Sequence, residues 1–274
     1  MGRRWQCSRE WAWPEHRVSE VPPEKRKLPL RRVIWGAFSL PWQHRGAVFR
    51  ATAFPLLALI GVSLFWEFLL WGEGFVAQLT SHVIYLAAFS WLAVTVHRLV
   101  LLDEVSSGSH FKALSWKRVA VYMLAFAAIG VIFLAAKFLP YNVIGIATGI
   151  NYVAVGTEPN LVARRWLDWG STLVSLLVIS RFVLVLPSIA VDKGHEFKDS
   201  WRMTRGNSWR LAVVYSVLPW ALSWFRWLLY RDGGSNFEFA LIVVLGCLFA
   251  VVEIVALSLS HAALTEDDTP ASPP

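Results

Sequence analysis

Six long apolar stretches divide the 274-residue chain, at residues 53–71, 83–102, 119–139, 171–191, 211–230 and 239–261. Each is close to the ~20 residues that a helix needs to cross ~30 Å of hydrocarbon. Hydrophobic residues make up 56% of the chain and charged residues only 16%, whereas an average soluble domain has about 25% charged residues. The bilayer must therefore solvate most of this surface. The sequence predicts an all-α, polytopic membrane protein with six transmembrane helices.

The distribution of basic residues predicts how these helices are oriented. Of the 26 Lys and Arg residues, 11 lie within residues 1–50, and others cluster at 112–118 and 193–210. The connection at 72–82 has no basic residue. Because cytoplasmic loops are enriched in Lys and Arg, we expect a multi-pass membrane protein with both termini in the cytoplasm.

The remaining segments are short, so one membrane domain at 51–262 accounts for most of the chain. Residues 1–30 mix prolines with charges and are predicted to form a disordered basic tail. Residues 263–274 are predicted to be a second disordered tail. Between them, residues 31–50 alternate apolar and basic positions in a helical pattern. We expect an interfacial amphipathic segment there, broken near Pro41 and lying on the cytoplasmic leaflet.

Two of the basic segments resemble each other. The first reads GSHFK at 108–112 followed by SWKRVAVY at 115–122, and the second reads GHEFK at 194–198 followed by SWRLAVVY at 208–215. Repeated units that cannot bury their apolar faces alone usually stack against one another. The pattern predicts that the six helices form three repeated helical hairpins.

Three motifs carry a resemblance to a known family: VHRLVLLDE at 96–104, RFVLVLP at 181–187 and SWRMTRGNSWR at 200–210. With these motifs the chain resembles a broad family of uncharacterised six-span bacterial inner-membrane proteins. That family is similar to the membrane domain attached to some glycerophosphodiester phosphodiesterases. In those proteins the hydrolase is a separate soluble domain, so the resemblance implies no catalytic residue in this chain.

Charged residues inside the apolar stretches are the first candidates for a site, because each is costly in hydrocarbon. Arg181 and Glu253 lie ten and eight residues before the inner ends of their stretches, so their depths differ by only about 3 Å. Glu67 and Arg226 both lie near outer ends. Each pair is either a structural ion pair or part of a substrate or proton path, and the structural interpretation is favoured.

Basic residues beside the spans are the second group of candidates. They suit the phosphates of anionic lipid headgroups on the cytoplasmic side, and they are Arg202, Arg205, Arg210, Lys117 and Arg118. The stretch around Gly206 lacks the features of a phosphate-binding loop. A helix stop at Gly206 with a new N-cap at Asn207 or Ser208 explains it better.

No constellation of residues predicts catalysis. Ser, His and Asp residues are too scattered to pair a nucleophile with a base, so we expect no enzyme activity and no cofactor. The boundary histidines, which are His97, His110, His195 and His261, lack a metal-ligand spacing, and we expect no metal site. The net charge of +7 reflects basic residues that flank the membrane rather than a nucleic-acid surface.

The function that fits these observations best is a scaffold, assembly factor or subunit that binds lipids or an unknown protein partner. The alternative is a small-solute or lipid transporter that uses Arg181 and Glu253 near mid-membrane.

Overall fold

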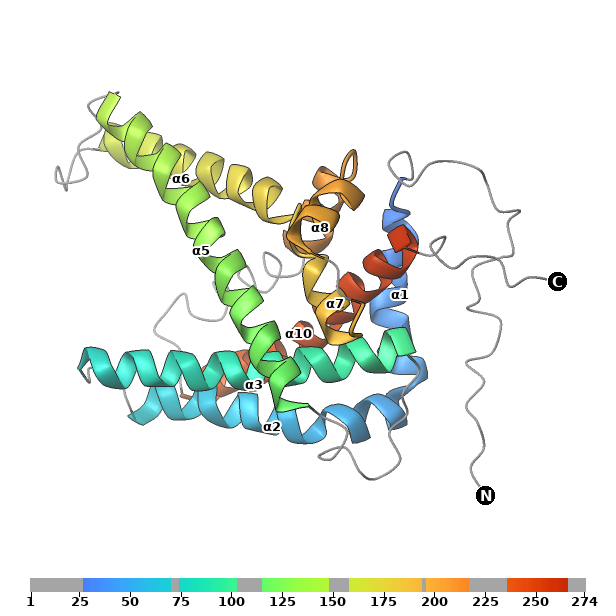
Figure 1. Cartoon of the computed structure of the whole chain (residues 1–274). Helices are drawn as coiled ribbons and strands as arrows, with labels where there is room; N and C mark the ends of the chain where they lie inside the picture. The colour runs from blue at the N-terminus through green and yellow to red at the C-terminus, as the bar shows by residue number, and fades with distance from the viewer. Residues whose placement is uncertain are drawn as a thin grey trace, which may run out of the picture.

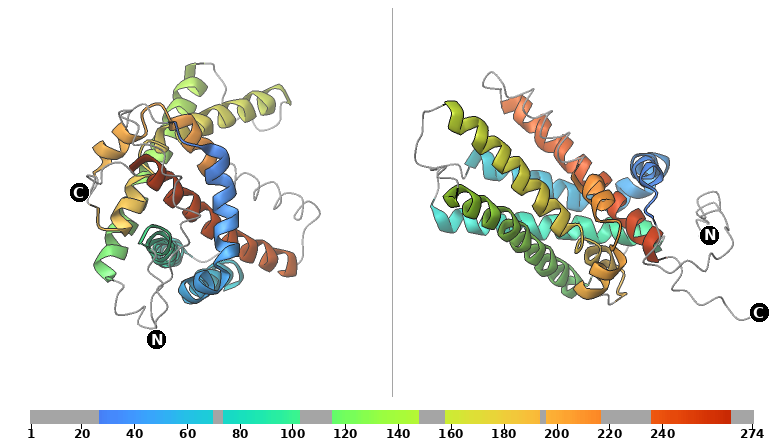
Figure 2. Two further views of the ribbon diagram at one scale, coloured as in Figure 1. Left: turned by 90° about the vertical axis from the view of Figure 1, so that its right-hand side faces the viewer. Right: turned by 90° about the horizontal axis from the view of Figure 1, so that it is seen from above.

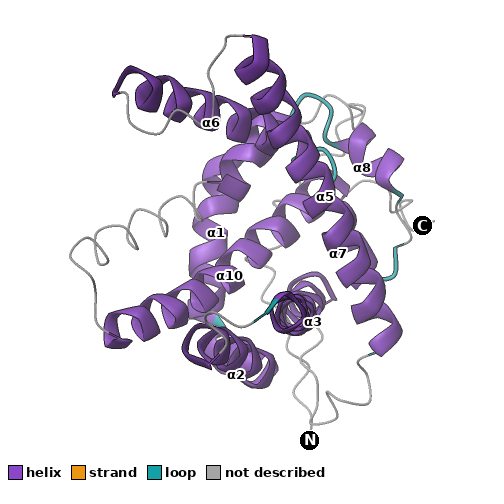
Figure 3. Ribbon diagram, turned by 90° about the vertical axis from the view of Figure 1, so that its left-hand side faces the viewer, coloured by secondary structure: helices purple, strands orange, loops and turns teal. Residues whose placement is uncertain are grey.

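The computed structural model describes residues 27–69, 74–102, 115–147, 158–193, 196–216 and 236–265. Within these residues every regular element is a helix (Figure 3). Four of the helices are long and apolar enough to cross a membrane: α2 (Arg45–Leu69), α3 (Phe75–Leu102), α5 (Trp116–Ala147) and α10 (Asn236–Thr265). The fold is therefore all-helical and of the membrane-protein type.

The long helices pack in neighbouring pairs (Figure 1). Helix α2 runs along α3, α10 packs against both, and α5 pairs with α6 (Glu158–Ile179). Small side chains in the buried core of α3 and α10 include Ser90, Ala93, Ala256 and Ser260. Small residues let neighbouring helices approach closely. The resulting van der Waals packing stabilises helix association in lipid, where the hydrophobic effect between helices is absent.

The fourth apolar stretch is not one continuous span. Helix α6 ends at Ile179, and turns at residues 180–184 lead into the short helix α7 (Val185–Ala190). Pro187 has no N–H to donate to the carbonyl of Val183. That carbonyl instead accepts a hydrogen bond from the N–H of Leu186, only three residues later, at 3.2 Å. The stretch at 171–191, predicted as one transmembrane helix, is thus interrupted at residues 180–184.

Side chains from the next helix complete the hydrogen bonds at this break. The carbonyl of Arg181 accepts a bond from the Ser200 hydroxyl at 2.8 Å and a longer one from Thr204 at 3.4 Å. Both residues belong to the segment of α8 (Phe197–Met203) and the turn that follows it. A broken helix is tolerated in a membrane protein when neighbouring side chains satisfy the freed backbone groups in this way.

Replacing Ser200 with alanine should destabilise the protein by about 1 kcal/mol, because the Arg181 carbonyl loses its shorter hydrogen bond. Ser188→Ala is the matched control. Both serines are fully buried, but Ser188 donates only within its own helix, to Val185 at 2.7 Å. Unfolding in mixed detergent micelles, followed by circular dichroism, measures both. Equal losses for the two variants would show that Ser200 does not support the break.

Two prolines lie inside helices, towards the C-terminal ends. Pro41 is within α1 (Leu30–Gln43), and the chain turns three residues later, at His44, before α2 begins. Pro140 lies within α5, which continues to Ala147, past the end of the apolar stretch at residue 139. In each case the proline is near the end of its helix, where few carbonyls lose a partner.

The fifth apolar stretch is described only at its start. Residues 208–216 are helical, and residues 217–235 lie outside the described part of the chain. The tails at 1–26 and 266–274 are also outside it, and α10 extends to Thr265, past the predicted domain end at residue 262.

Candidate functional site

Many of the polar and charged side-chain contacts lie at one end of the bundle. It holds α1, the start of α2, the last turns of α3 and α10, and the helix α8 (Figure 2, right). Arginine side chains stack on tryptophans at this end, Arg45 on Trp42 and Arg210 on Trp209, with guanidinium carbons 5.9 and 5.2 Å from the ring centroids. We call it the basic end.

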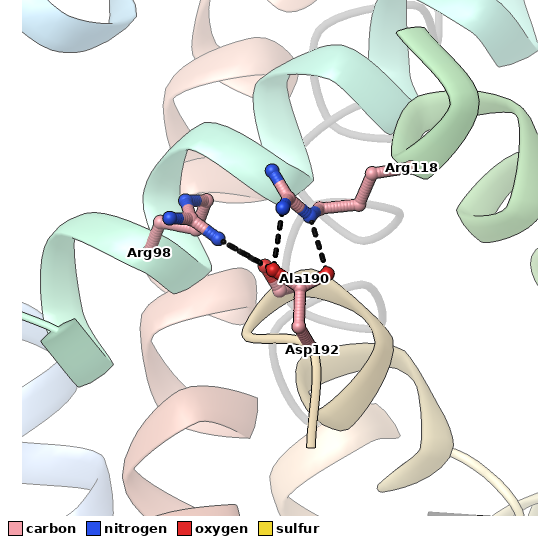
Figure 4. A network of polar contacts seen from close by, with 4 residues as sticks. All are labelled: Arg98, Arg118, Ala190 and Asp192. Carbon is pink, nitrogen blue, oxygen red and sulfur yellow. Dashed lines mark hydrogen bonds and ion pairs between the residues drawn. The ribbon is translucent and has the colours of Figure 1, made fainter. Parts of the chain in front are cut away.

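A cluster of two arginines and one aspartate joins three helices at the basic end (Figure 4). Arg118 of α5 donates to both carboxylate oxygens of Asp192, with its Nε 2.8 Å from Oδ1. Arg98 of α3 contacts the same carboxylate at 3.4 Å and donates to the carbonyl of Ala190 at 3.1 Å. The arginine side chains are only 15–17% exposed, whereas that of Asp192 is 60% exposed.

The end of α7 places Asp192 for this role. Lys193 N–H donates to the carbonyl of Ser188 and Asp192 N–H to that of Ile189, which is the hydrogen-bond pattern of a Schellman motif. Asp192 occupies the left-handed position of that motif, with φ of 58°. Aspartate tolerates this conformation better than most residues. The turn therefore aims the carboxylate at the two arginines.

The arginines change the acidity of Asp192. The hydrogen bond from Arg118 lowers the pKa of this carboxyl below its ordinary value of 3.8, and the charges of Arg118 and Arg98 act in the same direction. Arg98 also caps a carbonyl at the C-terminus of α7, where the helix dipole favours a cation. The cluster therefore holds α3, α5 and α7 together at neutral pH.

A second polar cluster is fully buried between α3, α5 and α10. His97 lies 2.7 Å from the Ser258 hydroxyl through Nδ1 and 3.2 Å from the Tyr122 hydroxyl through Nε2. Ser258 donates its only hydroxyl hydrogen to the carbonyl of Ile254, at 2.9 Å. We therefore assign the imidazole hydrogen to Nδ1, so that Nε2 accepts from Tyr122.

The chain before α1 is fastened to the segment after α8. Leu28 is fully buried, its N–H donates to the Asn207 side chain, and its carbonyl accepts from Arg210, both at 2.8 Å. As the sequence predicts, the chain turns at Gly206, whose φ of 82° suits glycine. The Asn207 amide oxygen binds Leu28. We call these three residues the Leu28 clasp.

Helix α1 turns an aromatic face away from the bundle. At ~100° per residue, Arg31, Trp35, Phe38 and Trp42 fall within an arc of about 60°. Trp35 and Trp42 are 72% and 73% exposed. The opposite side of the helix, which packs on the bundle at α10, holds the buried residues Val33, Gly36 and Ala37. We call the first set the outer face of α1.

Only one of the two predicted intramembrane pairs, Arg181 with Glu253, lies within the described residues. Arg181 lies at the break between α6 and α7, and its guanidinium stacks on Trp201 at 5.0 Å. Glu253 is partly buried near the middle of α10. Among the ion pairs of the described ranges, none joins Arg181 to Glu253. Arg226 and the side chain of Glu67 lie outside the described residues.

An ion pair that the sequence analysis did not identify joins α5 to α6. Lys137 and Asp168 approach to 3.1 Å, and both side chains are partly exposed. This pair sits on the α5–α6 hairpin, away from the arginines of the basic end.

The five predicted lipid-phosphate residues divide into two groups. Arg118 is bound to Asp192 and Arg210 to Leu28, so each already has a carboxylate or carbonyl partner within the protein. Arg202 pairs with Asp199 at 3.2 Å but remains 67% exposed. Lys117 and Arg205 are exposed as well. The side chains of the second group are exposed, whereas those of Arg118 and Arg210 are partly buried.

Sequence reasoning missed the role of Asp192 and the contacts of His97. Asp192 is 94 residues from Arg98 and 74 from Arg118, so no local spacing connects them. A partial signal was present, because Arg118 and Tyr122 both belong to the repeated segment at 115–122. In the described part of the chain, no group of three His, Cys, Asp or Glu residues could hold a metal ion.

The function has to be inferred from the structure, because comparison with known proteins gives no relative. No family model, no curated protein and no solved structure matches this chain.

Proposed function

We propose that this protein is a non-enzymatic membrane scaffold or partner-binding subunit that holds α1 in the cytoplasmic headgroup layer of a bacterial inner membrane. The outer face of α1 carries the proposal. Figure 2 (left) looks nearly along α2 and α3, and α1 lies across them. A helix in that orientation, with Arg and Trp on its free side, suits the boundary between headgroups and acyl chains.

The proposed topology has six spans in three hairpins with both termini inside. The neighbouring pairs α2–α3 and α5–α6 support hairpins. The helical start at 208–216 is where a fifth span would enter, and Trp209 there is exposed like Trp116 at the start of α5. This topology also agrees with the resemblance to six-span inner-membrane proteins, which we retain as a proposal.

Anionic lipids are the partners that the exposed charges favour. Arg31, Lys117 and Arg205 are exposed at the basic end, and Arg202 is mostly so. Each Lys or Arg near an anionic leaflet contributes about 1 kcal/mol of attraction. The transporter alternative needs Arg181 and Glu253 to line a path. The stacking of Arg181 on Trp201 supports the scaffold instead, because it gives this arginine a structural partner.

A label on the outer face of α1 tests the proposal. Phe38→Cys, in a Cys7→Ser, Cys247→Ala background, would carry an environment-sensitive fluorophore in proteoliposomes. We expect lipids brominated near the headgroup to quench it more strongly than lipids brominated near the chain ends, because the helix lies at shallow depth.

Lys193→Cys is the control for this labelling experiment. Lys193 is exposed in the connection between α7 and α8, so its label should respond to aqueous iodide and only weakly to brominated lipid. A label at residue 38 that behaves like the one at 193 would contradict the proposed placement of α1.

A further inference from the structure

A cavity of about 890 Å³ opens at the N-terminus of α1. Three arginines and one tryptophan contribute to its lining, with apolar residues between them, and among the described residues no carboxylate lines it. The lining consists of Leu28, Pro29, Leu30, Arg31, Arg32, Ile34, Trp35 and Arg210. This volume is within the range of small-molecule sites in proteins, which are about 300–1,000 Å³.

The walls of the cavity are held in place by contacts already described. The Leu28 clasp fixes the chain before α1 against Arg210, through two hydrogen bonds of 2.8 Å. Arg210 also stacks on Trp209. A guanidinium has five N–H donors, and the bond to Leu28 uses one of them. Arg210 is thereby oriented without exhausting its capacity to donate hydrogen bonds.

The electrostatics of the cavity favour an anion. Arg31, Arg32 and Arg210 bring three positive charges to one lining. Pro29 is the N-cap of α1 and makes no side-chain capping bond, and the positive end of the helix dipole adds to the same field. Guanidinium groups match the oxygens of a phosphate in bidentate geometry.

We propose that this cavity binds the phosphate of one anionic phospholipid, with Arg31 and Arg210 as its main ligands. The inference rests on the proposed placement of α1 in the headgroup layer. The apolar lining from Leu28, Leu30 and Ile34 suits the glycerol and upper acyl carbons of a lipid, and a free phosphate compound would leave it unused. The outer face of α1 continues from Trp35 directly into the surrounding membrane.

Native mass spectrometry of the full-length protein in mild detergent tests this site with short-chain phosphatidylglycerol. We expect one tightly bound lipid per chain, and about tenfold weaker binding in Arg31→Gln, the effect of losing a charge-assisted hydrogen bond. Arg50→Gln is the charge control, since Arg50 is exposed on α2 outside the cavity. It should bind as the wild type does.

A tryptophan pair separates the cavity from general membrane attraction. Trp35 lines the cavity and Trp42 does not, although they are equally exposed on the same face of α1. Trp35→Ala should weaken the tight binding severalfold and Trp42→Ala should not. Equal losses in the two variants, or in Arg31→Gln and Arg50→Gln, would overturn the proposal in favour of diffuse electrostatics.

Further ligands identify the source of the phosphate and separate this inference from the proposed function. Inorganic phosphate at millimolar concentration should not displace the lipid, and full displacement would mean that a free phosphate compound is the occupant. Binding as tight for phosphatidylcholine would overturn the requirement for an anionic lipid. Lipid quenching of the label at Phe38 should persist in Arg31→Gln, because the placement of α1 does not depend on the cavity being filled.

Discussion

Replacing His97 with alanine should destabilise the protein by about 2–4 kcal/mol, the cost of removing a large buried side chain from a packed core. His97 is fully buried and is the shared partner of Tyr122 and Ser258. The substitution therefore removes packing and deprives the Tyr122 hydroxyl of its acceptor. Unfolding in mixed detergent micelles gives the change in free energy.

Two serines on α10 isolate the polar part of this effect. Ser258 and Ser260 are both fully buried, and both donate to a carbonyl four residues earlier. Only Ser258 also accepts from His97. Ser258→Ala should therefore cost about 0.6–1.7 kcal/mol more than Ser260→Ala, which is the range for hydrogen bonds between membrane helices. A difference near zero would mean that the His97 contact contributes nothing.

Substitutions of Asp192 should separate its charge from its backbone conformation. Asp192→Gly removes the carboxylate but suits a φ of 58°. We expect it to cost about 1–2 kcal/mol, between the values for exposed and buried ion pairs. Asp192→Ala should cost about 1 kcal/mol more, because alanine is strained in this conformation. Wild-type stability in Asp192→Gly would show that the cluster with Arg98 and Arg118 is not stabilising.

The same cluster predicts a dependence on pH. The folded state lowers the pKa of Asp192 below 3.8, so the carboxylate stabilises the fold fully above that ordinary value and progressively less as pH falls through the lowered pKa. Asp192→Asn keeps a side chain that tolerates left-handed backbone but cannot ionise. The stability difference between wild type and Asp192→Asn should be constant above about pH 5 and shrink below pH 4. A pH-independent difference would contradict this assignment.

The sequence predicts the all-helical class and the positions of the long apolar helices, because the length of an apolar stretch is a local property of the sequence. All four long helices coincide with apolar stretches. The amphipathic pattern at 31–50 covers α1 but also the first residues of α2, which begins at Arg45. Helix ends were less predictable. The break after Ile179 depends on Ser200 and Thr204, which supply hydrogen bonds from about 20 residues away. The pattern of apolar residues does not predict which distant side chain supplies such a hydrogen bond.

The candidate site was predictable in composition but not in pairing. Basic residues and tryptophans at the ends of the apolar stretches can be identified in the sequence, whereas packing determines their partners. Arg118 and Arg210 both lie in the repeated segments, where Arg210 aligns with Lys117 rather than with Arg118. One binds a carboxylate and the other a backbone carbonyl. Arg181 stacks on a tryptophan. The position of a residue along its helix cannot distinguish these outcomes, because it determines neither the rotation of the helix about its axis nor which helices pack beside it.

The Leu28 clasp has a consequence for the order in which the chain assembles during synthesis. Leu28 is bound by residues 179 and 182 positions later. At about 5–20 residues per second, its partners leave the ribosome roughly 10–40 s after it does. During that interval α1 lacks both of these hydrogen bonds to the segment after α8. The hydrogen bonds of Leu28 can therefore form only after the segment that follows α8 has been synthesised.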